Sequence, residues 1–308
     1  MDSPVQRSEV REFLSSRRAR VTPQQAGLPA YGGNRRVKGM RREEVAMLAG
    51  VSVDYYVRME RGDLGGVSEG VLDSLATALQ LDEAEREHLY ALARAAGPGS
   101  ARRARAGTVP KVVRPVIQQV LDAMTDAPAW VRNGRHDILA MNALARALYS
   151  PVLASPVAGA TATRPANTTR YVYLDPAAHD FFLDYDVIAN DAAAMLRLEA
   201  SRNPHDKRLI ELVGELSTHS ELFRQRWASQ DVKLHRSGRK RLRHPVVGEL
   251  DLNFESMPLP SEPGLQLNVY TADPNTPTAD GLKLLASWAA SHSDQLVSAD
   301  TSSGDATH

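Results

Sequence analysis

The segment 42–62 (REEVAMLAGVSVDYYVRMERG) restricts the fold more than any other part of the sequence, because its special residues fall at the spacings of two short, closely crossing helices. Ala46 is small enough for a close approach, and Gly50, four residues later, permits the left-handed backbone of a tight turn. Val51 then fills the space between the helices, and Ser52 caps the second helix. The spacing predicts a helix-turn-helix.

The second helix of this motif divides into an inward and an outward face. Tyr56 and Met59 are three residues apart and are expected to face inward. The amino-terminal end and outer face are then free to enter a DNA groove, and the basic residues before the first helix are placed to contact phosphates. We therefore predict that double-stranded DNA contacts Arg35, Arg36, Lys38, Arg41, Arg42, Ser52, Val53, Asp54, Tyr55, Val57 and Arg58.

Charge is distributed unevenly along the chain. Lys and Arg together number 37 and Asp and Glu also number 37, yet the stretch 13–42 contains eight basic residues and no acidic one. A local cationic patch of this kind favours a polyanionic partner. The same helical spacing also occurs in domains that bind protein, so docking of a protein partner remains the alternative for this region.

The length of 308 residues predicts about two domains. We expect an all-α domain of five helices at 1–97, an exposed Gly-, Pro- and Arg-rich linker at 98–110, a mixed α/β domain at 111–290, and a disordered polar tail at 291–308. In the first domain, Thr22 and Asp82 are expected to cap helix starts, with Gln25 and Glu85 three residues later.

The second domain mixes two periodicities. Alternating apolar residues predict strands at 136–140, 246–255 and 265–271. An N-cap residue followed by proline predicts helix starts at Asp175-Pro176, Asn203-Pro204 and Thr276-Pro277. The segment 235–244 (HRSGRKRLRH) is interpreted as a solvated hairpin tip around Ser237-Gly238, with a second nucleic-acid contact as the alternative.

Several function classes are not supported by the sequence. The chain has no cysteine, no apolar signal segment and no apolar run long enough to cross a membrane, so we expect a cytoplasmic protein without a membrane partner. Signature motifs of hydrolases, phosphate-binding loops and metal sites are also lacking. We therefore predict no enzyme, no catalytic residues, no metal and no cofactor.

The helix-turn-helix residues resemble the XRE-type family, whose pattern continues in Glu60-Arg61-Gly62 and in the segment 72–79. Residues 41–62 are similar to the signature of MmyB-like regulators, and segments 137–140, 142–145, 174–176, 212–217 and 244–248 resemble the carboxy-terminal domain of that family. The resemblance implies a PAS-like fold with an internal pocket for a small apolar molecule, such as a fatty acid. It also implies a sequence-specific transcriptional regulator under ligand control, and such regulators usually bind DNA as homodimers.

Candidate ligand contacts in this domain are its large apolar or amphipathic side chains: Trp130, Met141, Leu148, Tyr171, Phe181, Phe182, Tyr185, Leu196, Phe223 and Trp227. Arg170 and Arg197 are candidates for binding a ligand carboxylate, because a buried arginine needs a partner. The alternative for both arginines is an ordinary salt bridge. The alternative for the whole chain is a protein-interaction module with a structural dimerisation domain and no ligand.

Overall fold

The computed structural model describes residues 4–29, 39–97 and 113–291. Contacts divide the chain into two compact units. The first unit contains Met1–Ala106 together with Arg197–Asp206 and Ala228–Leu234. The second unit contains Gly107–Leu196, Lys207–Trp227 and His235–His308. The predicted linker and residues 292–308 of the predicted tail lie outside the described residues.

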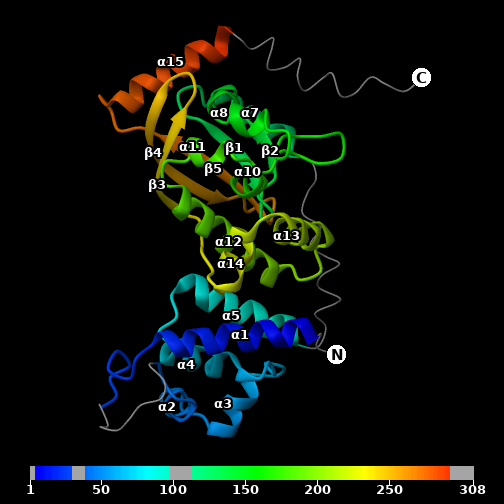
Figure 1. The fold of residues 1–308 in the computed structure, drawn as a ribbon, viewed down its shortest axis with the longest axis vertical. Helices are drawn as coiled ribbons and strands as arrows, with labels where there is room; N and C mark the ends of the chain where they lie inside the picture. The colour runs from blue at the N-terminus through cyan, green and yellow to red at the C-terminus, as the bar shows by residue number, and fades with distance from the viewer. Residues whose placement is uncertain (1–3, 30–38, 98–112, 292–308) are drawn as a thin grey trace, which may run out of the picture. The chain divides into compact units, whose positions relative to one another are not determined.

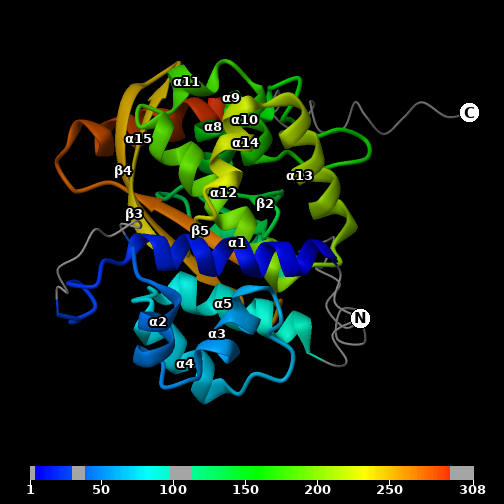
Figure 2. The same ribbon diagram turned by 60° about the horizontal axis from the view of Figure 1, so that its bottom comes forward.

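Within residues 4–29 and 39–97 the first unit folds into five helices, which confirms the all-α prediction. They are α1 (Pro4–Arg20), α2 (Arg42–Leu48), α3 (Val53–Glu60), α4 (Glu69–Ala78) and α5 (Glu83–Ala96). Figure 2 shows α1 lying along α5, with α2, α3 and α4 beside them. Phe13, Tyr56, Met59 and Leu75 are fully buried where these helices meet.

The two predicted capping boxes in this unit have different outcomes. Asp82 caps α5 as expected: its side chain accepts the backbone N–H of Glu85, and the Glu85 side chain accepts that of Asp82. Thr22 and Gln25 exchange the same kind of bonds, yet the chain forms only a single turn there. The prediction of a helix at Thr22 was wrong, because cap chemistry stabilises one turn and does not by itself propagate a helix.

Two short segments from far along the sequence complete the first unit. Leu198 and Val232 belong to its apolar core. The buried guanidinium of Arg17 lies 2.7 Å from the carboxylate of Glu85 and donates to the carbonyl oxygen of Gln230. The core of this unit therefore depends on residues far outside the helix-turn-helix sequence.

The second unit is a mixed α/β fold, as predicted, and it is built around a five-stranded antiparallel sheet (Figure 1). Its strand order is β2-β1-β5-β4-β3. The strands are β1 (Ala129–Asn133), β2 (Ile138–Met141), β3 (Ser237–His244), β4 (Gly248–Pro258) and β5 (Leu265–Thr271). The helices are α7 (Pro115–Ala123), α8 (Ala143–Leu148), α9 (Ser150–Leu153), α10 (Thr168–Leu174), α11 (Ala178–Phe181), α12 (Tyr185–Arg202), α13 (Lys207–His219), α14 (Glu221–Ala228) and α15 (Pro277–Ser291), of which α12 continues into the first unit.

Strand alternation gives the sheet two different faces. On one face Ala129 and Val131 of β1 pack with Leu265 of β5 and with Leu121 of α7. The opposite face carries the residues in between, which include Trp130 of β1 and its cross-strand partner Asn268 of β5. Both of these side chains are almost completely buried.

Several sequence predictions for this unit need correction. Strand β1 was missed, because all five of its residues are buried and alternation is therefore absent from its sequence. The segment 235–244 is not a hairpin tip, since positions 237–244 form β3, which pairs along its length with β4. Helix α15 begins at Pro277 as predicted, whereas α11 and α13 begin two and three residues after the predicted prolines. None of the described helices has the length and apolar content needed to span a membrane.

Candidate functional site

The geometry of the helix-turn-helix follows the prediction closely. Gly50 has a φ of +66°, and Ala46 is buried between the two helices. The backbone N–H of Tyr55 donates to Ser52 Oγ at 3.2 Å, which caps α3. Tyr56 and Met59 have no exposed surface. Helix α3 is therefore anchored through one side, and its opposite side is presented to solvent.

The solvent side of α3 carries polar and small side chains. Ser52, Val53, Asp54 and Arg58 are exposed, and Tyr55 and Val57 are half-buried. The guanidinium of Arg58 lies over the Tyr55 ring, 4.8 Å from its centroid, and pairs with Asp63 at 3.3 Å. The structure adds Arg7 of α1 and Arg61, which follows α3, to this surface: both are exposed and line a hollow beside Val57 and Arg58.

A buried carboxylate fixes the position of α3 relative to its neighbours. Glu60 is 2% exposed and accepts from Arg18 of α1 at 2.7 Å and from Arg42 of α2. The hydrogen bond to Glu60 raises the pKa of Arg42, so this side chain is held as a cation within the fold. Arg41 is exposed at the start of α2. The remaining predicted phosphate contacts, Arg35, Arg36 and Lys38, lie outside the described residues.

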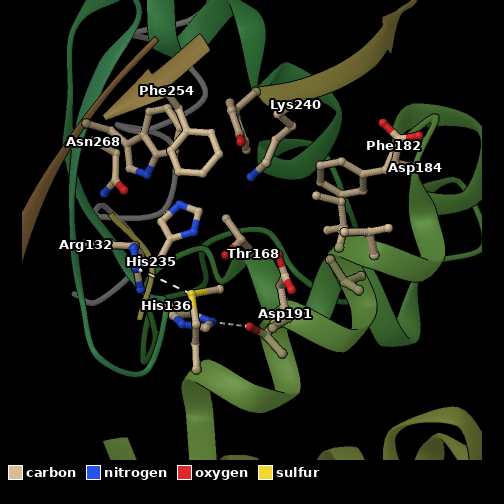
Figure 3. A pocket seen from close by; sticks show the side chains of 18 of the residues that line it. Arg132, His136, Thr168, Phe182, Asp184, Asp191, His235, Lys240, Phe254 and Asn268 are labelled. Atoms are coloured by element: carbon tan, nitrogen blue, oxygen red, sulfur yellow. Dashed lines mark hydrogen bonds between the residues drawn. The ribbon is translucent and has the colours of Figure 1, made fainter. Parts of the chain in front are cut away.

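The second unit contains a cavity of about 210 Å³ beside the inner face of the sheet (Figure 3). Its walls come from β1, β3, β4 and β5 of the sheet and from α10 and α12. The lining residues are Trp130, Arg132, His136, Tyr149, Thr168, Thr169, Val172, Phe182, Asp184, Val187, Ile188, Asp191, Ala192, Met195, His235, Arg239, Lys240, Phe254 and Asn268.

Burial controls the protonation of the groups in this cavity. His136 is buried, which lowers its pKa well below the ordinary value, and its Nδ1 lies 2.6 Å from Thr169 Oγ1. Burial and, to a smaller extent, the positive charge of Arg132 lower the pKa of Lys240 to about 8, while Asp191 opposes the shift. The cavity therefore combines aromatic and aliphatic walls with a few charged groups, which is typical of small-molecule sites. Among the described residues no group of three or more His, Asp or Glu side chains is placed to hold a metal ion.

Comparison with known protein families gives two matches. Residues 7–89 match the model of a helix-turn-helix domain, and residues 113–285 match that of the MmyB-like transcription regulator ligand binding domain. The chain belongs to the MmyB-like transcription regulators. No curated protein matches it. The two families together are those of DNA-binding and ligand-binding regulatory domains, and neither is an enzyme family.

For this MmyB-like regulator, the cavity brings together only two of the predicted ligand contacts, Trp130 and Phe182. Arg170 lies elsewhere and pairs with Glu215 at 2.8 Å, as the salt-bridge alternative proposes. Arg197 belongs to the first unit, where it lies 3.5 Å from Glu9. The other predicted contacts do not line the cavity: they are Met141, Leu148, Tyr171, Phe181, Tyr185, Leu196, Phe223 and Trp227.

The charged and polar groups that do line the cavity were missed by sequence reasoning, and Lys240 is the clearest case. In β3 the side chains alternate: Leu242 and His244 are buried, while Arg239, Arg241 and Arg243 are exposed and pair with acids. Lys240 lies on the same face as Leu242, which places it inside. The alternation R-K-R-L-R-H was visible in the sequence and indicates a strand with one inward lysine.

Proposed function

We propose that this MmyB-like regulator is a cytoplasmic homodimer that binds a double-stranded DNA operator through α3, and that a small ligand with an apolar body, of which a fatty-acid-like molecule is one type, controls this binding from the cavity. One helix-turn-helix covers only a half-site, so useful specificity needs two copies and a symmetric operator. The exposed residues at the amino-terminal end of α3 supply the base contacts, and the surrounding cations supply phosphate contacts.

The observation that carries this proposal is that the single helix α12 contributes residues to both units. Val187, Ile188 and Met195 of this helix line the cavity in the second unit. Leu198, three residues further along the same helix, is part of the apolar core of the first unit. A ligand that favours one position of α12 therefore acts on residues of both units through one continuous helix, provided that its affinity differs between the two states of the protein.

The alternative of a protein-interaction module with a purely structural second domain requires a filled core. The cavity beside Trp130 argues against this alternative. A second domain that serves only for dimerisation has no need for buried charged groups, because such groups lower the stability of the fold unless they have a partner.

Two measurements test the proposal. Native mass spectrometry of the purified chain should show a dimer that carries a small molecule. Selection of duplexes from a random library should yield an inverted repeat, whose affinity for the protein changes when that molecule is added. A monomer that selects no sequence, or a dimer whose operator affinity is indifferent to every bound molecule, contradicts the proposal. Arg58→Ala serves as the control for DNA binding, since its side chain is exposed.

A further inference from the structure

Lys240 is a half-buried cation whose ammonium group has no polar partner among the described residues. Within the described part of the chain this ammonium group forms no hydrogen bond and no ion pair, and three aromatic rings lie near it. Its Nζ lies 5.6 Å from the ring centroid of Phe254, 5.7 Å from that of Tyr270 and 5.9 Å from that of Phe182. Aromatic faces attract an ammonium group but do not use its three N–H donors. Figure 3 shows the side chain of Lys240 extending into the cavity.

A second pair of unsatisfied groups lies on the sheet wall of the same cavity. Trp130 Nε1 and Asn268 Oδ1 are buried and have no hydrogen-bond partner among the described residues. The two residues are opposite each other on β1 and β5, and both line the cavity. Buried polar groups almost always find partners, and one that is left unsatisfied lowers the stability of the fold. One group is a donor and the other an acceptor, which a single hydroxyl satisfies at once.

The volume limits the size of a ligand that reaches these groups. A dry cavity of about 150 Å³ accommodates benzene. By the same proportion, the cavity of about 210 Å³ suits a single ring with one or two small substituents better than a long acyl chain. The aromatic side chains of Trp130, Tyr149, Phe182 and Phe254 provide flat apolar walls for such a ring.

We propose that the cavity binds a compact aromatic hydroxy acid, with its carboxylate at Lys240 and its hydroxyl between Trp130 Nε1 and Asn268 Oδ1. This inference rests on the proposed function and narrows its ligand class. Arg132, on the same face of β1 as Trp130, adds positive charge to the cavity. The ligand then satisfies the three groups that the protein itself leaves without a polar partner.

Titration calorimetry of the full-length protein tests this inference with four probes: 4-hydroxybenzoate, benzoate, 4-hydroxybenzyl alcohol and decanoate. We expect one molecule of 4-hydroxybenzoate per chain, weaker binding of benzoate, at least 30-fold weaker binding of the alcohol, and no binding of decanoate. Lys240→Met should weaken 4-hydroxybenzoate at least 30-fold and leave the alcohol unchanged. Lys207→Met is the matched control, because Lys207 is exposed on α13, and it should change nothing.

A further variant separates the two ends of the ligand. Asn268→Leu should reduce the affinity for 4-hydroxybenzoate to that for benzoate, while benzoate itself binds as before. If Lys240→Met does not fold by circular dichroism, Lys240→Gln replaces it in the same comparison.

The inference is overturned if decanoate binds more tightly than benzoate, if the alcohol binds as tightly as the acid, if the Lys240 variants bind 4-hydroxybenzoate normally, or if no aromatic acid binds. Operator affinity measured beside each titration distinguishes this failure from failure of the proposed function. Binding of decanoate that changes operator affinity supports ligand control and rejects the aromatic acid. Binding of 4-hydroxybenzoate without any change in operator affinity supports the ligand class and rejects its control of DNA binding.

Discussion

The proposed DNA-contact surface and the proposed ligand cavity are built in opposite ways. The exposed residues of α3 come from one continuous stretch, 52–58, on a single helix. The cavity is lined by residues from position 130 to position 268, and its walls come from four strands and from the helices α10 and α12. The first site depends on helical spacing, which is local. The second depends on strand register and on which face of each strand points inward, so it exists only once the sheet has formed.

The largest expected effect on stability is at Gly62, where the chain that leaves α3 lies close against α1. Gly62 has a φ of +103°, and a Cβ there would lie 2.5 Å from the carbonyl oxygen of Arg7. Gly62→Ala should therefore lower the free energy of unfolding by about 3 kcal/mol, measured by urea denaturation. Gly50→Ala is the control, because its φ is +66° but nothing lies within 4 Å of the added Cβ. It should cost only about 1 kcal/mol. Equal effects of the two variants would show that backbone conformation alone, and not the contact with α1, fixes the end of α3.

The second-largest effect on stability is expected at Glu60, the buried carboxylate that joins α3 to α1 and α2. Glu60→Gln removes the charge that pairs with Arg18 and Arg42, and should lower the unfolding free energy by about 2 kcal/mol. Asp63→Asn removes the partner of Arg58 at the surface and should change stability by less than about 0.5 kcal/mol. Denaturation midpoints of the two variants check this contrast. An equal loss of stability in the two variants would contradict this expectation.

Operator binding is expected to separate from stability at Arg58. Because its side chain is 51% exposed, Arg58→Ala should reduce operator affinity about tenfold while the denaturation midpoint stays unchanged. Arg42→Ala should lower both quantities, since Arg42 also pairs with the buried Glu60. Fluorescence anisotropy with the selected operator, together with thermal unfolding, measures the two effects. An Arg58 variant with normal affinity would remove this residue from the DNA-contact surface.

Binding of an acid in the cavity should depend on pH. Burial lowers the pKa of Lys240 to about 8, and a bound carboxylate favours the charged amine, so binding takes up a proton above pH 8. The affinity for benzoate should thus be highest below this pKa and fall about tenfold between pH 7 and pH 9. The other titratable or charged groups that line the cavity with Lys240 are Arg132, His136, Asp184, Asp191, His235 and Arg239.

Lys240→Met provides the control for this pH profile, because it removes the titrating amine and leaves the other groups in place. Its weaker benzoate binding should be independent of pH over the same range, as measured by calorimetry. A slope that persists in this variant would assign the proton uptake to another residue of the cavity.

The same contrast between local and non-local structure explains how much of the fold the sequence predicts. The five helices of the first unit and the cap at Ser52 were predictable, because each depends on residues within a few positions of one another. Thr22 shows the limit of such local signals, since its cap bonds form without a helix. In the second unit, β1 was missed because burial on both faces removes the alternation on which strand prediction relies.

The candidate ligand site was predictable only in part. Aromatic content identified Trp130 and Phe182, but the same criterion also selected residues outside the cavity, such as Phe223 and Trp227. Arg170 and Arg197 were reasonable candidates for a carboxylate, and each lies near an acidic residue of the protein itself. The pairing of β3 with β4 decides how the cations of β3 are oriented. It directs Lys240 inward and Arg241 outward.

The sequence by itself determined the helix-turn-helix, the side of α3 that faces solvent and the membership of both domains in their families, because these properties follow from residue spacing along the chain. The tertiary structure alone decided that Leu198 and Val232 complete the first unit, and that Lys240, Trp130 and Asn268 meet at one cavity. The physical reason is that a helix presents its side chains by its own geometry, whereas a cavity is the space left between elements whose packing and register are settled only by the complete fold.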